Sequence, residues 1–156
     1  VLGEEHPDTL ASMNNLAETL WAQGDSNGAR KLQEKVLEIN RRILGEEHPD
    51  TLNSMGNLAE TLRAQGESDG ARELHEKALQ IRRQVLGERH PHTSVSAFNL
   101  LLTLRQTVGE EVRAQEIFSV HLAWLLQCAP ADLPSAEQRT IREQLLKMGI
   151  PRTGNG

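Results

Sequence analysis

Leu-Gly-Glu-Glu-His-Pro-Asp-Thr, at Leu2–Thr9, is the stretch of sequence that sets the frame for the whole chain. It returns unchanged at Leu44–Thr51 and again, as Leu-Gly-Glu-Arg-His-Pro-His-Thr, at Leu86–Thr93. The spacing is 42 residues both times, which indicates an array of repeats. Residues 1–42 and 43–84 are identical at 30 of 42 positions, whereas the third copy keeps the frame but differs more in sequence. In such arrays each unit buries its apolar face against its neighbours, so no unit needs to be stable alone.

Each repeat carries the pattern of two helices joined by a turn. In the first repeat, Pro7 suits a first helical turn, and Asp8 places negative charge near the positive end of the helix dipole. Gly24 lies in a polar stretch that favours a turn, and Gly45 favours a helix end. Apolar residues recur at helical spacing between these points, at Leu10, Met13, Leu16, Ala17 and Leu20 and then at Ala29, Leu32, Val36, Ile39 and Ile43. We therefore predict helices of about 16 and about 18 residues in every repeat.

The third repeat departs from the first two. Gly109 comes one residue later than the position of Gly66 predicts, which places an inserted residue between Arg105 and Gly109, near the end of the first helix of this repeat. The repeat also holds Phe98, Phe118 and Trp124, three of the four aromatic residues of the chain. Because the end of a repeat array needs a cap with a polar outer face, this extra apolar surface indicates that another segment covers it.

The residues after the third repeat supply a candidate for that cover. Pro130 and Pro134 indicate a break, and Ser135 followed by Gln138 matches a capping box at a helix start. The helix is either a cap or the first helix of a degenerate fourth repeat. The predicted organisation is three repeats at 1–42, 43–84 and 85–128, a linker at 129–134, a capping helix at 135–149 and a flexible tail at 150–156.

The composition excludes several classes of protein. A net charge of −5 at pH 7 argues against a nucleic-acid-binding protein, which usually presents a basic face. The single cysteine, Cys128, rules out an internal disulfide framework and suits a reducing compartment, so we expect a cytoplasmic protein. No apolar run approaches the roughly 20 residues of a membrane span. The chain begins inside a repeat, which indicates a segment of a longer array.

The histidines and the cysteine have structural interpretations. His6, His48 and His90 each precede a proline at a predicted helix start, where a hydrogen bond in the linker is expected. They lie a whole repeat apart, without the close ligand spacing of a metal site. His121 and Cys128 fall on the apolar stripe of the last repeat. We interpret them as a buried imidazole with a hydrogen-bond partner, or alternatively a pH-sensitive weak point, and as a buried structural thiol.

No catalytic motif occurs in the sequence in the structural context that its chemistry requires. It contains no phosphate-binding Gly-x-x-x-x-Gly-Lys-Ser/Thr and no His-Glu-x-x-His. The Gly-x-Ser-x-Gly pattern occurs at Gly24–Gly28 and Gly66–Gly70, but there it forms the polar turn between two predicted helices instead of the strand-to-helix turn that a nucleophilic serine requires. We therefore predict no catalytic residue, no metal site and no cofactor, and do not expect an enzyme.

The pattern of an Asn-Leu-Ala triplet, then glycine, then alanine five residues later resembles the tetratricopeptide repeat. The triplets are at 15–17 and 57–59, the glycines are Gly24 and Gly66, and the alanines follow at positions 29 and 71. The 42-residue period and the linker are similar to the kinesin light chain subgroup. The resemblance covers residues 1 to about 128. It implies an all-α fold, a right-handed α-α superhelix of three helical hairpins plus the capping helix, and a concave groove lined by the first helices.

The resemblance gives the asparagines a role. Asn15, Asn57 and Asn99 hold the same position in the first helix of each repeat, although asparagine has a low helix propensity. In the family, an asparagine here faces the groove and holds the backbone of a bound peptide. An amide suits that task because it donates and accepts at once. The alternative is a hydrogen bond between neighbouring helices.

Other positions differ between repeats that are otherwise nearly identical, as a selective surface would. Trp21 is either a binding hot spot or a contact to a further repeat. Arg63 and Arg105 could bind a carboxylate, but the glutamates nearby make the groove mixed in charge, so no strong preference for acidic peptides is expected. The candidate partner-binding residues are Asn15, Glu18, Trp21, Asn53, Asn57, Glu60, Arg63, Asn99 and Arg105.

These features predict a scaffold for protein–protein interaction that receives a peptide or a partner's helix in the concave groove. Self-association through exposed repeat ends, or a spacer role in a longer array of a multidomain signalling protein, is the alternative. The expected partner is a protein or peptide, with a homo-oligomer as the other option, and neither nucleic acid nor membrane is expected.

Overall fold

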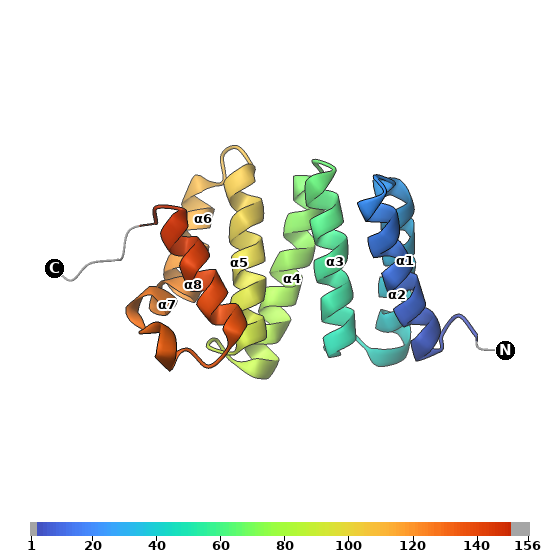
Figure 1. The fold of residues 1–156 in the computed structure, drawn as a ribbon, viewed down its shortest axis with the longest axis horizontal. Coiled ribbons are helices and arrows are strands. Elements are labelled where there is room, and N and C mark those ends of the chain that lie inside the picture. The colour runs from blue at the N-terminus through green and yellow to red at the C-terminus, as the bar shows by residue number, and fades with distance from the viewer. Residues whose placement is uncertain (1–2, 151–156) are drawn as a thin grey trace. The chain divides into compact units, whose positions relative to one another are not determined.

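The computed structural model describes residues 3–150, and every regular element in that range is a helix (Figure 1). The chain divides into two compact units, residues 1–74 and 75–156, with the boundary inside α4 (Ser68–Leu86). The all-α prediction is therefore confirmed. Of the predicted tail at 150–156, residues 151–156 lie outside the described range.

The first unit is built from α1 (Pro7–Ala22), α2 (Ser26–Leu44), α3 (Pro49–Ala64) and the first part of α4. Helix α2 packs against α1 on one side and against α3 on the other. Leu10, Val36 and Ile39 form a small buried cluster, with Met13 against it. The helices have the predicted length, because proline at each start and glycine after each end fix the same limits in both repeats.

The repeated histidines cap the helices that follow them. The Nδ1 atoms of His6, His48 and His90 each accept a hydrogen bond, at 3.2 Å, from the backbone N–H two residues later. These N–H groups have no partner within their own helix, so the imidazole takes the place that a serine or aspartate usually fills. The predicted linker hydrogen bond is confirmed in all three repeats.

A side chain from each second helix ties it to the next first helix. Asn40 Nδ2 of α2 donates to Ser54 Oγ of α3 at 2.9 Å. In the second unit, Arg82 Nη1 of α4 donates to Ser96 Oγ of α5 (Pro91–Gln106) at 2.7 Å. Asn40 and Arg82 are buried and hold equivalent positions in their repeats. These two buried side chains thus have hydrogen-bond partners, as burial requires.

The second unit agrees with one detail of the prediction for the third repeat and corrects another. Helix α5 is 16 residues long, as α1 and α3 are, so the inserted residue lies in the turn directly after it, between Arg105 and Gly109 as predicted. The second helix of the repeat is not one regular helix. It consists of α6 (Glu111–Ile117), the π-helical turn η1 (Phe118–Leu122) and α7 (Ala123–Gln127). The Ala123 N–H reaches the Phe118 carbonyl, five residues back, which defines the wider turn.

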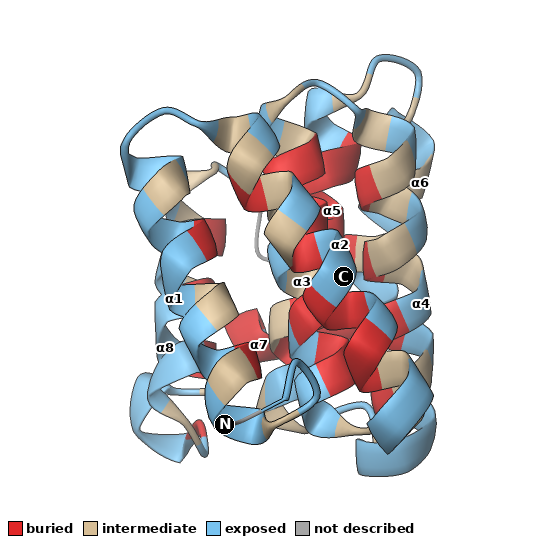
Figure 2. Cartoon of the chain, turned by 90° about the vertical axis from the view of Figure 1, so that its right-hand side faces the viewer, coloured by how far each residue is buried: buried red, intermediate tan, exposed pale blue. Residues whose placement is uncertain are grey.

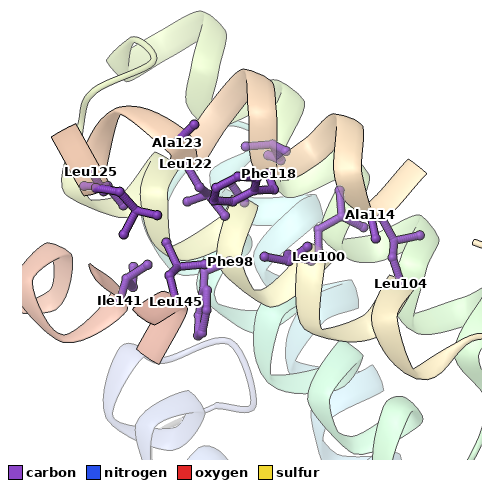
Figure 3. Packing of buried hydrophobic residues seen from close by; sticks show 14 of the residues in the cluster. Phe98, Leu100, Leu104, Ala114, Phe118, Leu122, Ala123, Leu125, Ile141 and Leu145 are labelled. Atoms are coloured by element: carbon purple, nitrogen blue, oxygen red, sulfur yellow. The ribbon is translucent and has the colours of Figure 1, made fainter. Parts of the chain in front are cut away.

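A final helix covers the last repeat as predicted. After the short 3-10 turn η2 (Pro130–Asp132), α8 (Ala136–Lys147) packs on α5 and α7 (Figure 1). Its Ile141 and Leu145 join a buried cluster with Phe98, Leu122 and Leu125 (Figure 3). Ser135 Oγ accepts from the Gln138 N–H, which confirms the predicted helix start.

His121 and Cys128 differ from each other in how far they are buried. His121 is 7% exposed, and its Nδ1 lies 3.0 Å from a carboxylate oxygen of Glu88, so the interpretation as a buried, partnered imidazole is confirmed. Cys128 is half-buried rather than buried, because α7 ends at Gln127 and the chain turns extended at the cysteine. The expectation of a buried thiol was wrong to that extent.

Candidate functional site

A groove runs between α1 and α3 in the first unit. Its larger part has a cavity volume of about 660 Å³. From α1 it is lined by Leu10, Asn14 and Glu18, and from α3 by Asn53 and Asn57; Ile43 and Leu44 of α2 add apolar surface. The last two are 45% and 39% exposed, so this surface is open to a partner.

A smaller part of the groove, of about 340 Å³, continues toward the other ends of the two helices. Trp21 of α1 lines it opposite Glu60 and Arg63 of α3. Glu18 and Asn57 line both parts, so they lie where the two join. The indole of Trp21 is 42% exposed, which leaves a large aromatic surface for contact.

The two walls arise from one helical spacing. On α1, Asn14, Glu18 and Trp21 follow one another by four and three residues, and on α3 Asn53, Asn57 and Glu60 do the same. This spacing places each set on a single face of its helix. The groove therefore forms where these two helix faces meet, and α2 packs against both helices.

Carboxylates dominate the charge of the lining. Glu60 is paired with Arg63 on the same helix at 2.6 Å, and Glu5 is paired with Arg42 at 2.5 Å. Arg63 is thus already neutralised by its neighbour, which argues against its predicted use as a carboxylate clamp. Glu18 makes no ion pair within residues 3–150.

The structure brings together six of the nine candidate residues: Glu18, Trp21, Asn53, Asn57, Glu60 and Arg63. Asn15 does not line this groove. Asn57 faces α1 across it, so Asn15, the equivalent residue one repeat earlier, is exposed on a different face of α1. Its neighbour Asn14 lines the groove instead, and sequence reasoning missed it. The available signal was variation, since Gly56 and Phe98 hold the same position in the other repeats.

Asn99 and Arg105 belong to the second unit, where both lie on α5. Asn99 is half-buried and Arg105 is exposed. Their candidacy continues to rest on their equivalence to residues of the other repeats.

Neither a cluster of metal ligands nor a membrane-spanning helix occurs among residues 3–150. Within residues 3–150, no three His, Cys, Asp or Glu side chains gather where they could hold a metal ion. None of the described helices combines the length and the apolar character that crossing a membrane requires.

Among known proteins, the similarity is to repeat proteins. Two crystal structures of a Podosopora anserina protein assigned as a kinesin light chain, with nearly identical repeats, match at TM-scores of 0.71 and 0.68. They are 33% and 30% identical to the chain, cover 81% and 92% of it, and are themselves covered over 59% of their length. BtubC (BKLC) from P. vanneervenii shares the fold at 20% identity and a TM-score of 0.61, over 92% of this chain and 58% of that one.

The chain therefore spans less than two thirds of each of these structures. No curated protein matches it. The family described as tetratricopeptide repeat matches residues 8–84 and 57–123, most of the chain. With the helical hairpins described above, this match confirms the predicted fold class and shows that the chain belongs to the tetratricopeptide repeat family.

Proposed function

We propose that the groove between α1 and α3 binds a peptide segment of another protein. Tetratricopeptide repeats generally mediate protein–protein interaction, and the placement of this site is our proposal. One observation carries it: three amide side chains, Asn14, Asn53 and Asn57, line the same groove as the exposed Trp21. Amides can pair with both the N–H and the C=O of an extended peptide, and tryptophan is enriched among the residues that dominate binding energy.

The mechanism is presentation on a pre-built surface, without a covalent step. The groove walls are helices, and their relative position is fixed by α2, which packs on both and is tied to α3 through Asn40 and Ser54. Because the walls are ordered before binding, the partner bears most of the ordering cost.

A matched pair of variants tests this proposal. Peptides of 12 residues are selected from a random display library on the wild-type protein, and the affinity of the selected peptides is measured by fluorescence anisotropy. We expect Asn57→Ala and Trp21→Ala to weaken binding about tenfold, which corresponds to roughly 1.4 kcal/mol. Asn15→Ala, the same change on another face of α1, should leave it unchanged. Equal effects of Asn57→Ala and Asn15→Ala would exclude the groove.

Self-association is a second candidate, favoured by the outer face of α1. Only Leu10 and Ala17 are buried in α1, and the helix is mainly exposed or half-buried (Figure 2). Leu16 is 49% exposed, whereas its equivalent Leu58, beneath α2, is 6% exposed.

Sedimentation at a series of protein concentrations tests the second candidate. If α1 pairs with another copy, the mass should rise with concentration for the wild type and remain that of a monomer for Leu16→Glu. A mass independent of concentration excludes self-association and leaves the groove proposal intact.

The proposal includes a non-catalytic role in the cytoplasm. The single Cys128, half-buried in the second unit, is compatible with a reducing compartment. Fractionation of source cells with an antibody to the chain tests the location, and recovery outside the cytosol would refute it.

A further inference from the structure

The charge of the groove carries information about its partner. Four carboxylates line its two parts, those of Glu5, Glu18, Asp50 and Glu60, against the single guanidinium of Arg63. A ligand with the same sign of charge would meet repulsion there, and a cationic one would be attracted. The chain as a whole is also acidic, with a net charge of −5, so the long-range field acts in the same direction.

Three of these carboxylates already have a local role. Glu60 and Glu5 pair with Arg63 and Arg42. Asp50 lies in the first turn of α3, beside His48, where the positive end of the helix dipole stabilises it.

Glu18 is in a different position. It lies four residues before the C-terminal end of α1, far from the N-terminal end whose dipole would stabilise a carboxylate, and it makes no ion pair within residues 3–150. It lines both parts of the groove, opposite Asn57, and Trp21 follows it by three residues on the same face. A carboxylate beside an exposed indole is suited to a long cationic side chain. The head group can make charge-assisted hydrogen bonds to the carboxylate, while the methylene stem or the guanidinium plane contacts the aromatic ring.

We propose that the groove selects peptide segments that carry a lysine or arginine, with the cationic head at Glu18, its stem on Trp21, and the neighbouring backbone at Asn53 and Asn57. This inference rests on the proposed peptide-binding function and names the chemistry of the partner. Acidic segments are disfavoured, because they would place a second negative charge beside Glu18. Arg63, the cation of the lining, is already paired with Glu60 and does not offset that repulsion.

The selected 12-residue peptides provide the first test. On the wild-type protein, the selected pool should be enriched in lysine and arginine relative to the starting library, and the binding of individual peptides should weaken as salt rises from 50 to 500 mM, because exposed charge pairs are screened. A pool without that enrichment, or one enriched in aspartate and glutamate, overturns the inference.

Charge reversal provides the second test. Glu18→Lys should weaken the best cationic peptide about tenfold or more, and Glu18→Gln by a smaller factor. The same peptide with its critical lysine or arginine changed to glutamate should bind Glu18→Lys better than it binds the wild type. Glu143→Lys is the matched control, since Glu143 is exposed on α8 and its reversal changes the net charge equally. Equal losses in the two reversals would show that only net charge matters and overturn the site.

The results separate this inference from the proposed function. If peptides bind and depend on Asn57 and Trp21 but not on Glu18, the groove remains the site and the cationic preference is wrong. If no peptide binds, or if binding ignores all the groove variants, the proposed function fails as well. Helicity and thermal unfolding by circular dichroism are compared for every variant, and Glu18→Gln provides the readout if the reversed variant does not fold.

Discussion

The side-chain amide of Asn40 on α2 donates a hydrogen bond to Ser54 Oγ on α3 at 2.9 Å, and both residues are buried. Arg82 makes the same contact with Ser96 one repeat later. In the third repeat the equivalent residue is Leu125, which packs in the apolar cluster beneath α8. The first two repeats are thus joined to the next hairpin by a buried side-chain hydrogen bond, whereas in the third repeat an apolar contact beneath α8 stands in its place.

The hydrogen bond between Asn40 and Ser54 should contribute measurably to stability. We expect Asn40→Ala to lower the free energy of unfolding by about 1–2 kcal/mol, because a buried hydrogen bond is lost and a small cavity is left. In a double-mutant cycle with Ser54→Ala, measured by urea unfolding, the coupling energy should be about 1 kcal/mol. Strictly additive effects of the two substitutions would show that the contact contributes nothing of its own.

The histidine caps should tolerate replacement by an ordinary capping residue. We expect His48→Ala to lower the free energy of unfolding by about 1 kcal/mol, since the N–H of Asp50 loses its partner. His48→Asn offers a side-chain acceptor again and should retain most of the stability. Urea unfolding of the two variants checks this, and equal losses would mean that the imidazole acts through packing instead of capping.

Much of the fold could be predicted because the repeat supplies the same local signals three times. Proline after histidine starts each first helix, and glycine ends it, so the bounds of α1, α3 and α5 follow from sequence. The π-helical turn η1 could not be predicted. Residues 118–122 contain no proline or glycine, and their apolar spacing fits a regular helix as well as a widened one.

The candidate site was predicted in part, for a geometric reason. Equivalence between repeats assigns one position to every repeat, which is how Asn15 was chosen together with Asn57. This groove, however, has one wall on α1 and the other on α3. Because the two walls face each other, the positions that line it on α1 are not the ones that line it on α3. Asn57 lines the wall on α3, whereas the wall on α1 uses Asn14, so the equivalent position in α1 misses the groove.

Glu88 should make the free energy of unfolding of the second unit depend on pH in the acidic range. Partial burial alone would raise the pKa of its carboxyl, but the hydrogen bonds to His121 and Arg83 outweigh it and hold the pKa below the ordinary value of 4.5. A carboxylate with a lowered pKa adds stability above its unfolded-state pKa, and that stability is lost as the pH falls through the folded-state pKa. We therefore expect the wild type to lose stability below about pH 4.5 more steeply than Glu88→Gln does.

Thermal unfolding of the two proteins between pH 7 and pH 3 measures this difference. The matched control is Glu143→Gln, which removes a carboxylate from an exposed site on α8 and should follow the wild type. Parallel curves for wild type and Glu88→Gln would show that the contact with His121 does not stabilise the charged carboxylate in solution.

Two glycines within helices should respond differently to replacement by alanine. Gly56 lies in the middle of α3, and a Cβ added there would meet no atom within 4 Å, so Gly56→Ala should raise the free energy of unfolding by about 0.5–1 kcal/mol through helix propensity alone. At Gly28 the added Cβ would come within 2.3 Å of Asp25 Oδ2, the carboxylate that caps α2 by accepting from the Gly28 N–H. Loss of that cap costs about 1 kcal/mol and offsets the gain, so Gly28→Ala should not stabilise the protein. Urea unfolding distinguishes the two, and a stabilised Gly28→Ala would mean that the Asp25 cap contributes little.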